Sequence, residues 1–162
     1  MKRSNVLVRA AGLADLAAIV DFNERLASET ENRISDRDVL TQGVRAALTD
    51  PDRLRYWVAE APETGEVVGQ AAVSREWSDW RNGWLWWLQS VYVREGSRGQ
   101  GVFRSLYGHI RSVARESLDV VGLRLYVEQD NDRAQHTYVA LGMTAAGYHV
   151  YEEIWWDRSG GE

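Results

Sequence analysis

The chain has 162 residues, 44% of them hydrophobic, and a formal net charge of −5 at pH 7. This length provides one domain with a sizeable core but not two, so we expect a single domain. The acidic balance and the lack of any Lys/Arg cluster argue against nucleic acid as the main partner, because duplex binding needs a basic face that neutralises phosphates.

Cysteine is absent from the sequence, which excludes a disulfide framework, a thiolate nucleophile and a cysteine-ligated metal. His109, His136 and His149 show no metal-ligand spacing, and we expect no metal site. The apolar run near the N-terminus is too short for a signal peptide or a membrane span. These features fit a cytoplasmic protein that has no membrane partner.

In the first half of the chain, apolar residues recur with the spacing of strands and amphipathic helices. We expect strands at 6–9, 55–60 and 67–77, and helices at 15–28 and 36–48. The polar run Thr49-Asp50-Pro51 stops the second helix. Pro62 and Gly65 mark the turn between the last two of these strands.

In the second half, Asn82-Gly83 marks a hairpin that leads into a strand at 84–93. The elements expected after it are a helix with an apolar stripe from 102 to 113, a strand at 123–127, a helix at 133–141 and a hairpin at 144–156. This order predicts an α/β fold, or α+β in schemes that count the hairpins separately, with about four helices around a mixed, mostly antiparallel sheet of about six to seven strands. The domain is expected to cover 1–156, followed by a frayed polar tail at 157–162.

The most informative segment is the glycine-spaced loop between the strand at 84–93 and the helix that follows it. Gly96, Gly99 and Gly101 allow backbone conformations closed to other residues and let a ligand approach the main chain. The helix presents first-turn N–H groups and a positive dipole end, and Arg98 and Arg104 add charge beside them. This architecture is typical of a phosphate cradle, although glycines before a helix also form ordinary tight turns.

A second motif follows the strand expected at 123–127. Its residues are Asn131, Ala134, Tyr138 and Gly142. With this motif placed beside the loop, the chain resembles the GNAT superfamily of acyl-CoA-dependent N-acyltransferases. The family's loop pattern, Arg/Gln-x-x-Gly-x-Gly/Ala, is matched at Arg98 and Gly101, with Phe103 in place of the last small residue. Its second pattern, Asn-x-x-Ala-x-x-x-Tyr-x-x-x-Gly-Phe, is matched by the four motif residues, with Met143 for Phe.

The resemblance implies an N-acetyltransferase that moves an acetyl group from acetyl-CoA to a primary amine of a small molecule or peptide by direct attack on the thioester. The implied cofactor-binding residues are Val91, Tyr92, Val93, Arg98, Gly99, Gln100, Gly101, Val102, Phe103, Arg104, Asn131 and Tyr138. The main-chain N–H groups of 91–93 are implied to polarise the thioester carbonyl, and Tyr138 to protonate the leaving thiolate. Two simpler roles also fit, because Tyr138 could be a packed helix tyrosine and Asn131 an ordinary helix cap.

The general base is open, because the strand at 84–93 carries no acid where many members of the family have a carboxylate. Glu29 and Glu31 are the leading candidates, since they lie between the two early helices, in the segment that lines the acceptor mouth in this family. Glu76 and Asp79 lie at the far end of the preceding strand, and any of these four could be a solvated surface charge. The remaining alternative is water relayed by Gln89, Ser90 or Tyr92. The substrate-binding candidates are Glu31, Trp86 and Gln89.

The chain contains eight tryptophans, and five of them surround the expected hairpin at Asn82-Gly83. These five are Trp77, Trp80, Trp84, Trp86 and Trp87. They can form an acceptor pocket that holds an amine by cation–π contact, or core packing together with a dimer surface. Trp155-Trp156 strengthens the interface interpretation, and we expect a homodimer.

A second class of function, an acyl-CoA-binding or sensor protein without catalysis, fits the same loop. Tyr138 and the intact loop favour the enzyme, and the missing strand carboxylate favours the binding protein. A nucleotide hydrolase is disfavoured, because no Gly-Lys-Ser/Thr follows the glycine turn.

Overall fold

The computed structural model of the chain describes residues 5–30 and 35–155. The chain divides into two compact units, Met1–Arg124 and Leu125–Glu162. The predicted tail at 157–162 lies outside the described residues. Within the described part, no helix is long and apolar enough to cross a membrane.

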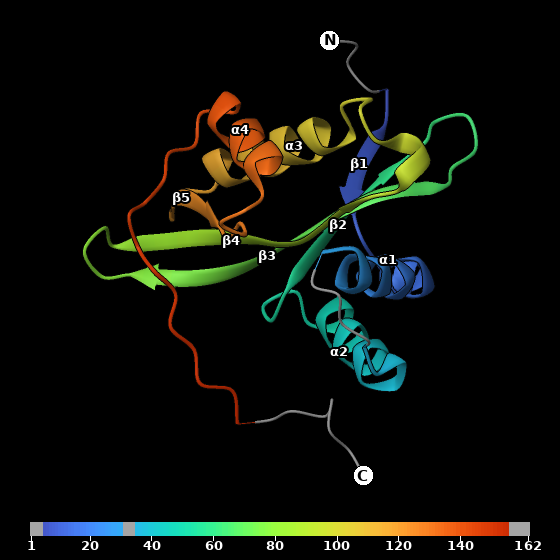
Figure 1. Ribbon diagram of the computed structural model, residues 1–162, viewed down its shortest axis with the longest axis horizontal. Helices are drawn as coiled ribbons and strands as arrows, with labels where there is room; N and C mark the ends of the chain where they lie inside the picture. The colour runs from blue at the N-terminus through green and yellow to red at the C-terminus, as the bar shows by residue number, and fades with distance from the viewer. Residues whose placement is uncertain (1–4, 31–34, 156–162) are drawn as a thin grey trace. The chain divides into compact units, whose positions relative to one another are not determined.

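The larger unit is built on a sheet whose strands follow one another in chain order (Figure 1). The strands are β1 (Leu7–Ala10), β2 (Arg55–Glu60), β3 (Val67–Ser78), β4 (Gly83–Val93) and β5 (Val120–Leu125). The first four pair antiparallel, with Arg9 opposite Val58, Val58 opposite Gln70 and Gln70 opposite Tyr92. Asn82, with φ of 49°, forms the predicted turn between β3 and β4.

Strand β5 runs parallel to β4. The Trp84 N–H donates to the Asp119 carbonyl at 2.7 Å, Leu85 lies against Gly122, and the Arg124 guanidinium lies 5.9 Å from the Trp87 ring centroid. Because these contacts advance in the same direction along both strands, the pair is parallel. The mixed, mostly antiparallel α/β sheet predicted from the sequence is therefore confirmed.

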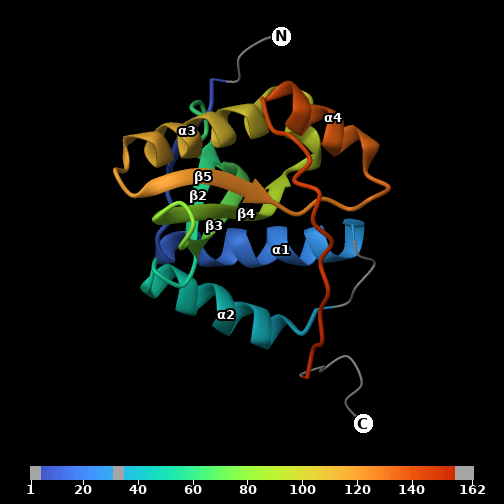
Figure 2. The ribbon, with the colours of Figure 1, turned by 90° about the vertical axis from the view of Figure 1, so that its left-hand side faces the viewer.

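Helices cover both faces of this sheet (Figure 2). The short 3-10 helix η1 (Leu13–Asp15) leads into α1 (Leu16–Thr30), which lies with α2 (Arg37–Thr49) on one face, and α3 (Val102–Glu116) lies on the other. Asp36 caps α2 by accepting hydrogen bonds from the N–H groups of Asp38 and Val39 at 3.0 and 3.2 Å. The smaller unit contains α4 (Asp132–Ala140).

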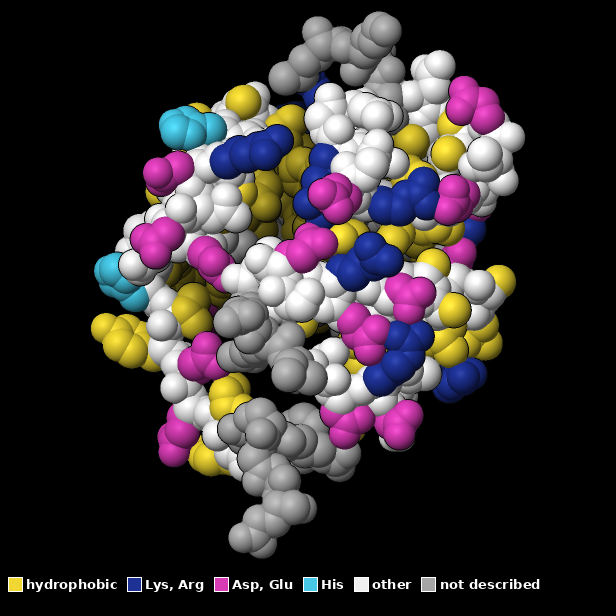
Figure 3. All heavy atoms as spheres, turned by 45° about the vertical axis from the view of Figure 1, so that its right-hand side comes forward, with side chains coloured by type: hydrophobic (Ala, Val, Ile, Leu, Met, Phe, Trp, Pro, Cys, Tyr) yellow, Lys and Arg dark blue, Asp and Glu magenta, His cyan; other side chains and the backbone are white. Residues whose placement is uncertain are grey.

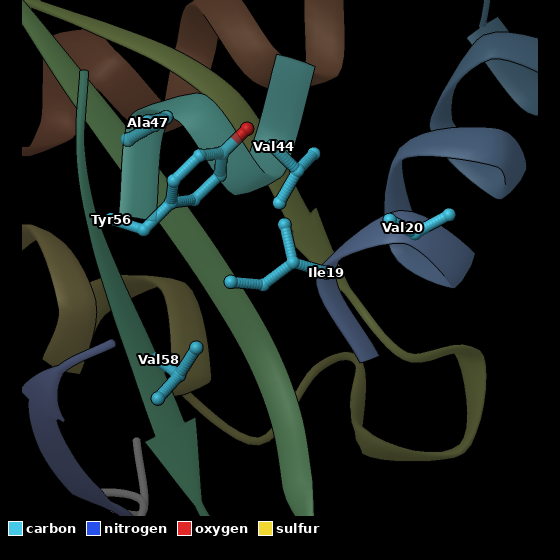
Figure 4. Close-up of a cluster of buried hydrophobic side chains, with 7 residues drawn as sticks. Ile19, Val20, Val44, Ala47, Tyr56 and Val58 are labelled. Atoms are coloured by element: carbon cyan, nitrogen blue, oxygen red, sulfur yellow. The ribbon is translucent and has the colours of Figure 1, made fainter. Parts of the chain in front are cut away.

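The core between α1, α2 and the sheet is formed by side chains from the apolar stripe of each helix and from alternate positions of β2 and β3 (Figure 4). Its buried members are Ile19, Val20, Val44, Ala47, Tyr56, Val58 and Ala72. Alternation along the strands assigns the residues between Tyr56 and Val58, or next to Ala72, to the opposite face of the sheet.

On that opposite face, α3 approaches β3 closely at Gly69. A Cβ atom at this position would lie 2.9 Å from Val102 Cγ1 and 3.4 Å from Leu106 Cδ1, so only glycine allows the contact. The approach places the N-terminus of α3 directly beside the paired ends of β3 and β4, because Gly69 pairs with Val93.

The sheet has five strands in the described residues, which corrects the predicted six to seven. The predicted hairpin at 144–156 forms no strand over 144–155, and Trp156 lies outside the described residues. Tyr148, Val150 and Ile154 do alternate with other residues, but they are exposed. An alternating pattern becomes a strand only where a neighbouring strand supplies hydrogen-bond partners, and a lone hairpin is marginally stable.

Strand β5 begins earlier than the predicted strand at 123–127. The start of β5 was not predicted because glycine in a sequence usually marks a turn, and Gly122 lies near that start. Here the glycine lies inside the strand and leaves room for a neighbouring side chain, since a Cβ at Gly122 would lie 3.0 Å from Leu85 Cδ2.

Candidate functional site

The glycine-spaced loop forms a left-handed entry into α3. After β4, the chain passes through the short 3-10 helix η2 (Glu95–Ser97), which contains Gly96, and then through Gly99 and Gly101 with φ of 74° and 82°. A positive φ at both positions is the reason glycine is needed there. Gly101 is the N-cap of α3, so the loop ends directly at a helix N-terminus. Such a terminus attracts anions through its dipole and its first-turn N–H groups.

The neighbouring loop residues fall into a buried and an exposed group. Val102 is buried in the first turn of α3, and Phe103 packs against Tyr107 with ring centroids 6.1 Å apart. Gln100 and Arg104 are exposed, and the Gln100 side-chain amide donates to the Gly96 carbonyl at 3.3 Å. The loop is therefore held by its own side chains, while α3 is anchored to the sheet by apolar residues.

Arg98 ties this loop to α1. Its guanidinium donates to the Glu29 carboxylate at 2.7 Å and to the Val93 carbonyl at 2.9 Å, and lies 5.3 Å from the Tyr92 ring centroid. The Tyr92 hydroxyl donates to the other Glu29 oxygen at 3.0 Å. Glu29, Tyr92 and Arg98 therefore form one cluster joining α1, β4 and the loop, which we call the Glu29 cluster.

This cluster fixes the charge state of Glu29. The hydrogen bond from Arg98 lowers the pKa of the Glu29 carboxyl, with a further contribution from the Tyr92 hydroxyl. Burial and the neighbouring Glu29 charge raise the pKa of Tyr92. Glu29 is therefore ionised at neutral pH, and a carboxylate with a lowered pKa is a weak proton acceptor.

Of the other acidic candidates, Glu76 and Asp79 lie away from the loop. Glu31 lies outside the described residues. Glu76 accepts a hydrogen bond from Arg124 at 2.8 Å, and Asp79 accepts one from the Trp80 N–H at 3.0 Å within the β3–β4 turn. Glu76 lies in the half of β3 away from Gly69, so neither of the last two is close to the loop.

Strand β4 is distorted just before residues 91–93. Gln70 pairs with Tyr92 and Ala72 with Gln89, so two steps on β3 match three steps on β4. This is a β-bulge, and Ser90 adopts φ of 51° within it. The bulge lies at the position where the resemblance places the carbonyl-polarising N–H groups.

Gln70, whose side chain contacts the bulge, was not among the candidates predicted from the sequence. Gln70 is fully buried and donates from Nε2 to the Ser90 carbonyl at 2.9 Å and to Asn23 Oδ1 at 2.8 Å. Its signal in the sequence is a lone polar side chain in the apolar run from Val67 to Val73. Such a residue in a buried strand needs a partner, and here the partner is the bulge.

The proposed substrate residues on β4 separate onto different faces. Gln89 is exposed and pairs with Ala72, which belongs to the core on the α1 side, so Gln89 shares that face. Trp86 is 5% exposed and lies on the other face, with its ring centroid 6.0 Å from that of Trp57. Burial favours the core interpretation for Trp86, whereas Gln89 is accessible.

The other hairpin tryptophans are more exposed. Trp77 and Trp84 pack edge to face with ring centroids 5.0 Å apart. In contrast to the buried Trp86, Trp77 is 48% exposed and Trp80 is 88% exposed. The tryptophan group therefore divides into a buried part and a surface part.

The second motif has a clear local structure within the smaller unit. The Asn131 side chain accepts a hydrogen bond from the Ala134 N–H at 3.1 Å, so it caps α4. Gly142, with φ of 96°, ends the helix, and the Met143 N–H donates to the Tyr138 carbonyl at 3.0 Å. Tyr138 lies on α4, and burial raises the pKa of its hydroxyl.

Charged side chains are interspersed on the surface. Acidic and basic groups lie next to one another on the face seen in Figure 3. Several arginines are ion-paired, among them Arg9 with Asp15 and Arg37 with Asp21. In the described ranges, no three His, Asp or Glu side chains are grouped so as to hold a metal ion.

A hollow of about 350 Å³ lies at the opposite end of β2 from the loop. Its lining is mostly apolar, with Leu48, Leu54, Trp57 and Val113, and Arg55 supplies charge. Among the described residues no carboxylate lines it, so it offers no anionic partner for an ammonium.

Comparison with known proteins agrees with this geometry. A sequence model of the acetyltransferase (GNAT) family matches residues 16–143, which includes parts of both units. The structure is similar to that of a possible acetyltransferase from Clostridium difficile 630, with 41% sequence identity over 94% of this chain and 99% of that one and a TM-score of 0.86. It shares its fold with a predicted acetyltransferase with acetyl-CoA from Clostridium acetobutylicum, at 17% identity, a TM-score of 0.74 and coverage of 91% and 96%. No curated protein matches the chain.

Proposed function

Because this chain belongs to the acetyltransferase (GNAT) family, we propose that it transfers an acetyl group from acetyl-CoA to a primary amine of a small molecule or peptide. The observation that carries the proposal is the left-handed glycine loop, which ends at the N-terminus of α3 beside the bulged strand β4. This combination supplies what a coenzyme A thioester needs, an anion site for the diphosphate next to main-chain groups for the carbonyl.

In this proposal, the loop binds the diphosphate and β4 binds the acyl group. The first-turn N–H groups of α3, with Arg98 and Arg104, hold the phosphate oxygens. Main-chain N–H groups of 91–93 donate to the thioester oxygen, on which negative charge develops as the amine attacks. The amine nitrogen forms a bond to the carbonyl carbon, the carbon–sulfur bond breaks, and the coenzyme leaves as a thiolate.

Tyr138 is the proposed donor of the proton that the thiolate takes up. Its support is its place in the second motif and its raised pKa, which keeps the hydroxyl protonated through neutral and mildly alkaline pH. Asn131 holds the start of α4, and its capping hydrogen bond supports a structural role beside any cofactor contact.

The proton lost by the amine goes, in our proposal, to water. Glu29 is ionised and committed to Arg98, which supports a role in positioning the loop and attracting the ammonium form rather than in accepting its proton. Glu31, from its place in the chain, is the alternative proton acceptor. The exposed Gln89 lies on the α1 face of β4 and is a candidate for orienting the water.

The homodimer and the cytoplasmic location remain predictions. Exposed apolar side chains near the C-terminus, including Tyr151, Ile154 and Trp155, support a dimer surface. Light scattering on the purified protein would give the mass in solution, and a monomer at micromolar concentration would remove the dimer from the proposal.

A thiol-release assay tests the proposed reaction. The protein is mixed with acetyl-CoA and a panel of amines that includes amino acids, polyamines, amine drugs and short peptides. Release of coenzyme A that requires one amine, with the N-acetyl product found by mass spectrometry, is the expected result. Tight acetyl-CoA binding without release on any amine would favour the alternative, a non-catalytic acyl-CoA-binding or sensor protein.

A further inference from the structure

A chain of buried and half-buried polar side chains connects α1 to the bulge of β4. Gln70 Nε2 donates to both Asn23 Oδ1 and the Ser90 carbonyl, and Asn23 Nδ2 donates to the Tyr56 hydroxyl at 3.2 Å. Both neighbours of Gln70 Nε2 are acceptor oxygens, so only the NH₂ end of the amide can face them. The orientation of Gln70 is therefore determined by its surroundings.

Gln70 carries one cost in stability and makes one contact that an apolar side chain could not make. Gln70 Oε1 is buried and has no hydrogen-bond partner among the residues that the structure describes. A buried acceptor without a partner costs free energy, and an apolar side chain of similar size would avoid that cost. What an apolar side chain could not do is hold the Ser90 carbonyl.

The held carbonyl belongs to the peptide group that joins Ser90 to Val91. In a trans peptide the C=O and N–H bonds lie in one plane and point in opposite directions. Since the Ser90 carbonyl points at Gln70, the Val91 N–H points away from it. Ser90 is also one of the few non-glycine residues with a positive φ here, a conformation that needs support from its neighbours.

We propose that Gln70 is a positioning residue that, through the Ser90 carbonyl, aims the Val91 N–H at the acyl carbonyl, and that Asn23 holds Gln70 in place. This inference rests on the proposed function, because it assigns a support to the N–H group that polarises the thioester. Gln70 does not touch the substrate in this arrangement. Its effect should therefore appear in the chemical step and not in coenzyme A binding.

The direct test is infrared spectroscopy of acetyl-CoA labelled with ¹³C at the carbonyl, bound to the protein without an amine. A hydrogen bond from Val91 lowers the carbonyl stretching frequency below its value in water. The Gln70→Met variant keeps the side-chain volume but has no donor, so it should lose most of this shift. We expect its affinity for coenzyme A to change less than about twofold and its turnover, once an acceptor is known, to fall about tenfold to a hundredfold.

Graded variants keep the test decisive if Gln70→Met does not fold. Asn23→Leu removes the hydrogen bond that orients Gln70 but leaves the Ser90 contact, so an intermediate shift is expected. Tyr56→Phe leaves both bonds of Gln70 and should retain the wild-type frequency.

Two outcomes would overturn the inference in different ways. A wild-type shift that persists in Gln70→Met would show that Gln70 does not aim the Val91 N–H, and one that persists in Asn23→Leu would show that Asn23 does not hold Gln70 in place for this role. A wild-type protein that binds acetyl-CoA without any shift would remove carbonyl polarisation from the proposed function, and the inference with it.

Discussion

The Arg98 guanidinium and the Glu29 carboxylate form an ion pair of 2.7 Å that joins the glycine-spaced loop to α1. The same arginine also contacts β4, since its Nε donates to the Val93 carbonyl. A phosphate ligand at the loop must therefore share Arg98 with Glu29 or displace it. This competition gives the first prediction.

Replacing Glu29 with Gln should strengthen coenzyme A binding. The change removes the charge that competes for Arg98 but keeps the side-chain size. Because Arg98 and Glu29 are 42% and 38% exposed, solvent screens the pair and the gain should be modest, about fivefold or less. Calorimetry at low salt measures it. Glu24→Gln is the control, because Glu24 lies on the same helix, α1, and pairs with Arg37 of α2. Unchanged or weaker binding would contradict the competition.

Replacing Asp15 with Asn should destabilise the protein near neutral pH by about 1–3 kcal/mol. Asp15 is buried, accepts two hydrogen bonds from Arg9 at 2.8 Å, and accepts one from the Gly12 N–H at 2.8 Å. The hydrogen bonding to Arg9 lowers the pKa of Asp15. A lowered folded-state pKa gives stability that is full above the unfolded value of about 3.9 and is lost as the pH falls further.

Urea unfolding at a series of pH values tests this prediction. The difference between wild type and Asp15→Asn should be largest at neutral pH and should shrink below about pH 4, where the Asp15 carboxylate becomes protonated in the unfolded chain. Glu63→Gln, in an exposed turn, is the control. A difference that stays constant down to pH 2.5 would contradict the assignment.

Most helices and strands could be located from the sequence, because the spacing of apolar residues matches the faces that are buried in the structure. The strands at β2 and β3 and the helices α1 to α3 were predicted close to their observed bounds, and the loop was recognised from Gly96, Gly99 and Gly101. The hairpin at 144–156 failed because alternation cannot reveal whether a partner strand exists. The start of β5 was missed because Gly122 looks like a turn.

The contacts of the candidate site between residues far apart in the sequence could not be predicted in this way. The Glu29 cluster joins residues 69 positions apart, and the Gln70 chain joins three strands and a helix. No local pattern encodes such contacts, because they depend on how α1 lies on the sheet. The bulge itself is invisible in the apolar run of β4, since an inserted residue changes the register without changing composition.

Replacing Tyr138 with Phe should lower turnover about a hundredfold or more and change coenzyme A affinity much less. The hydroxyl must be protonated to act as the acid, and burial raises its pKa above the ordinary value of about 10. Wild-type activity should therefore rise with pH as the amine loses its proton and fall only above about pH 10. The pH profile of Tyr138→Phe should lack that fall. Tyr151→Phe, at an exposed site, is the control, and equal turnover in wild type and Tyr138→Phe would exclude the acid role.

Replacing Gly108 with Ala should stabilise the protein by up to about 1 kcal/mol. Gly108 lies in α3, it is exposed, and a Cβ there would meet nothing within 4 Å. Gly99→Ala should instead destabilise it, because φ of 74° is unfavourable for alanine. Thermal melts of both variants measure the contrast, and a stabilising Gly99→Ala would mean that the loop does not need its left-handed conformation.

The central claim is that the loop before α3 binds the diphosphate of a coenzyme A thioester, and calorimetry on Gly101→Asp tests it most directly. Aspartate is a good N-cap and tolerates the left-handed region, so the variant should fold, but its charge repels phosphate at the helix terminus. The matched control is Gly65→Asp, since Gly65 has φ of 69° in an exposed turn. We predict that wild type and Gly65→Asp bind acetyl-CoA equally well and that Gly101→Asp binds it at least about tenfold more weakly. Equal binding by all three proteins, or no binding by the wild type, would contradict the account.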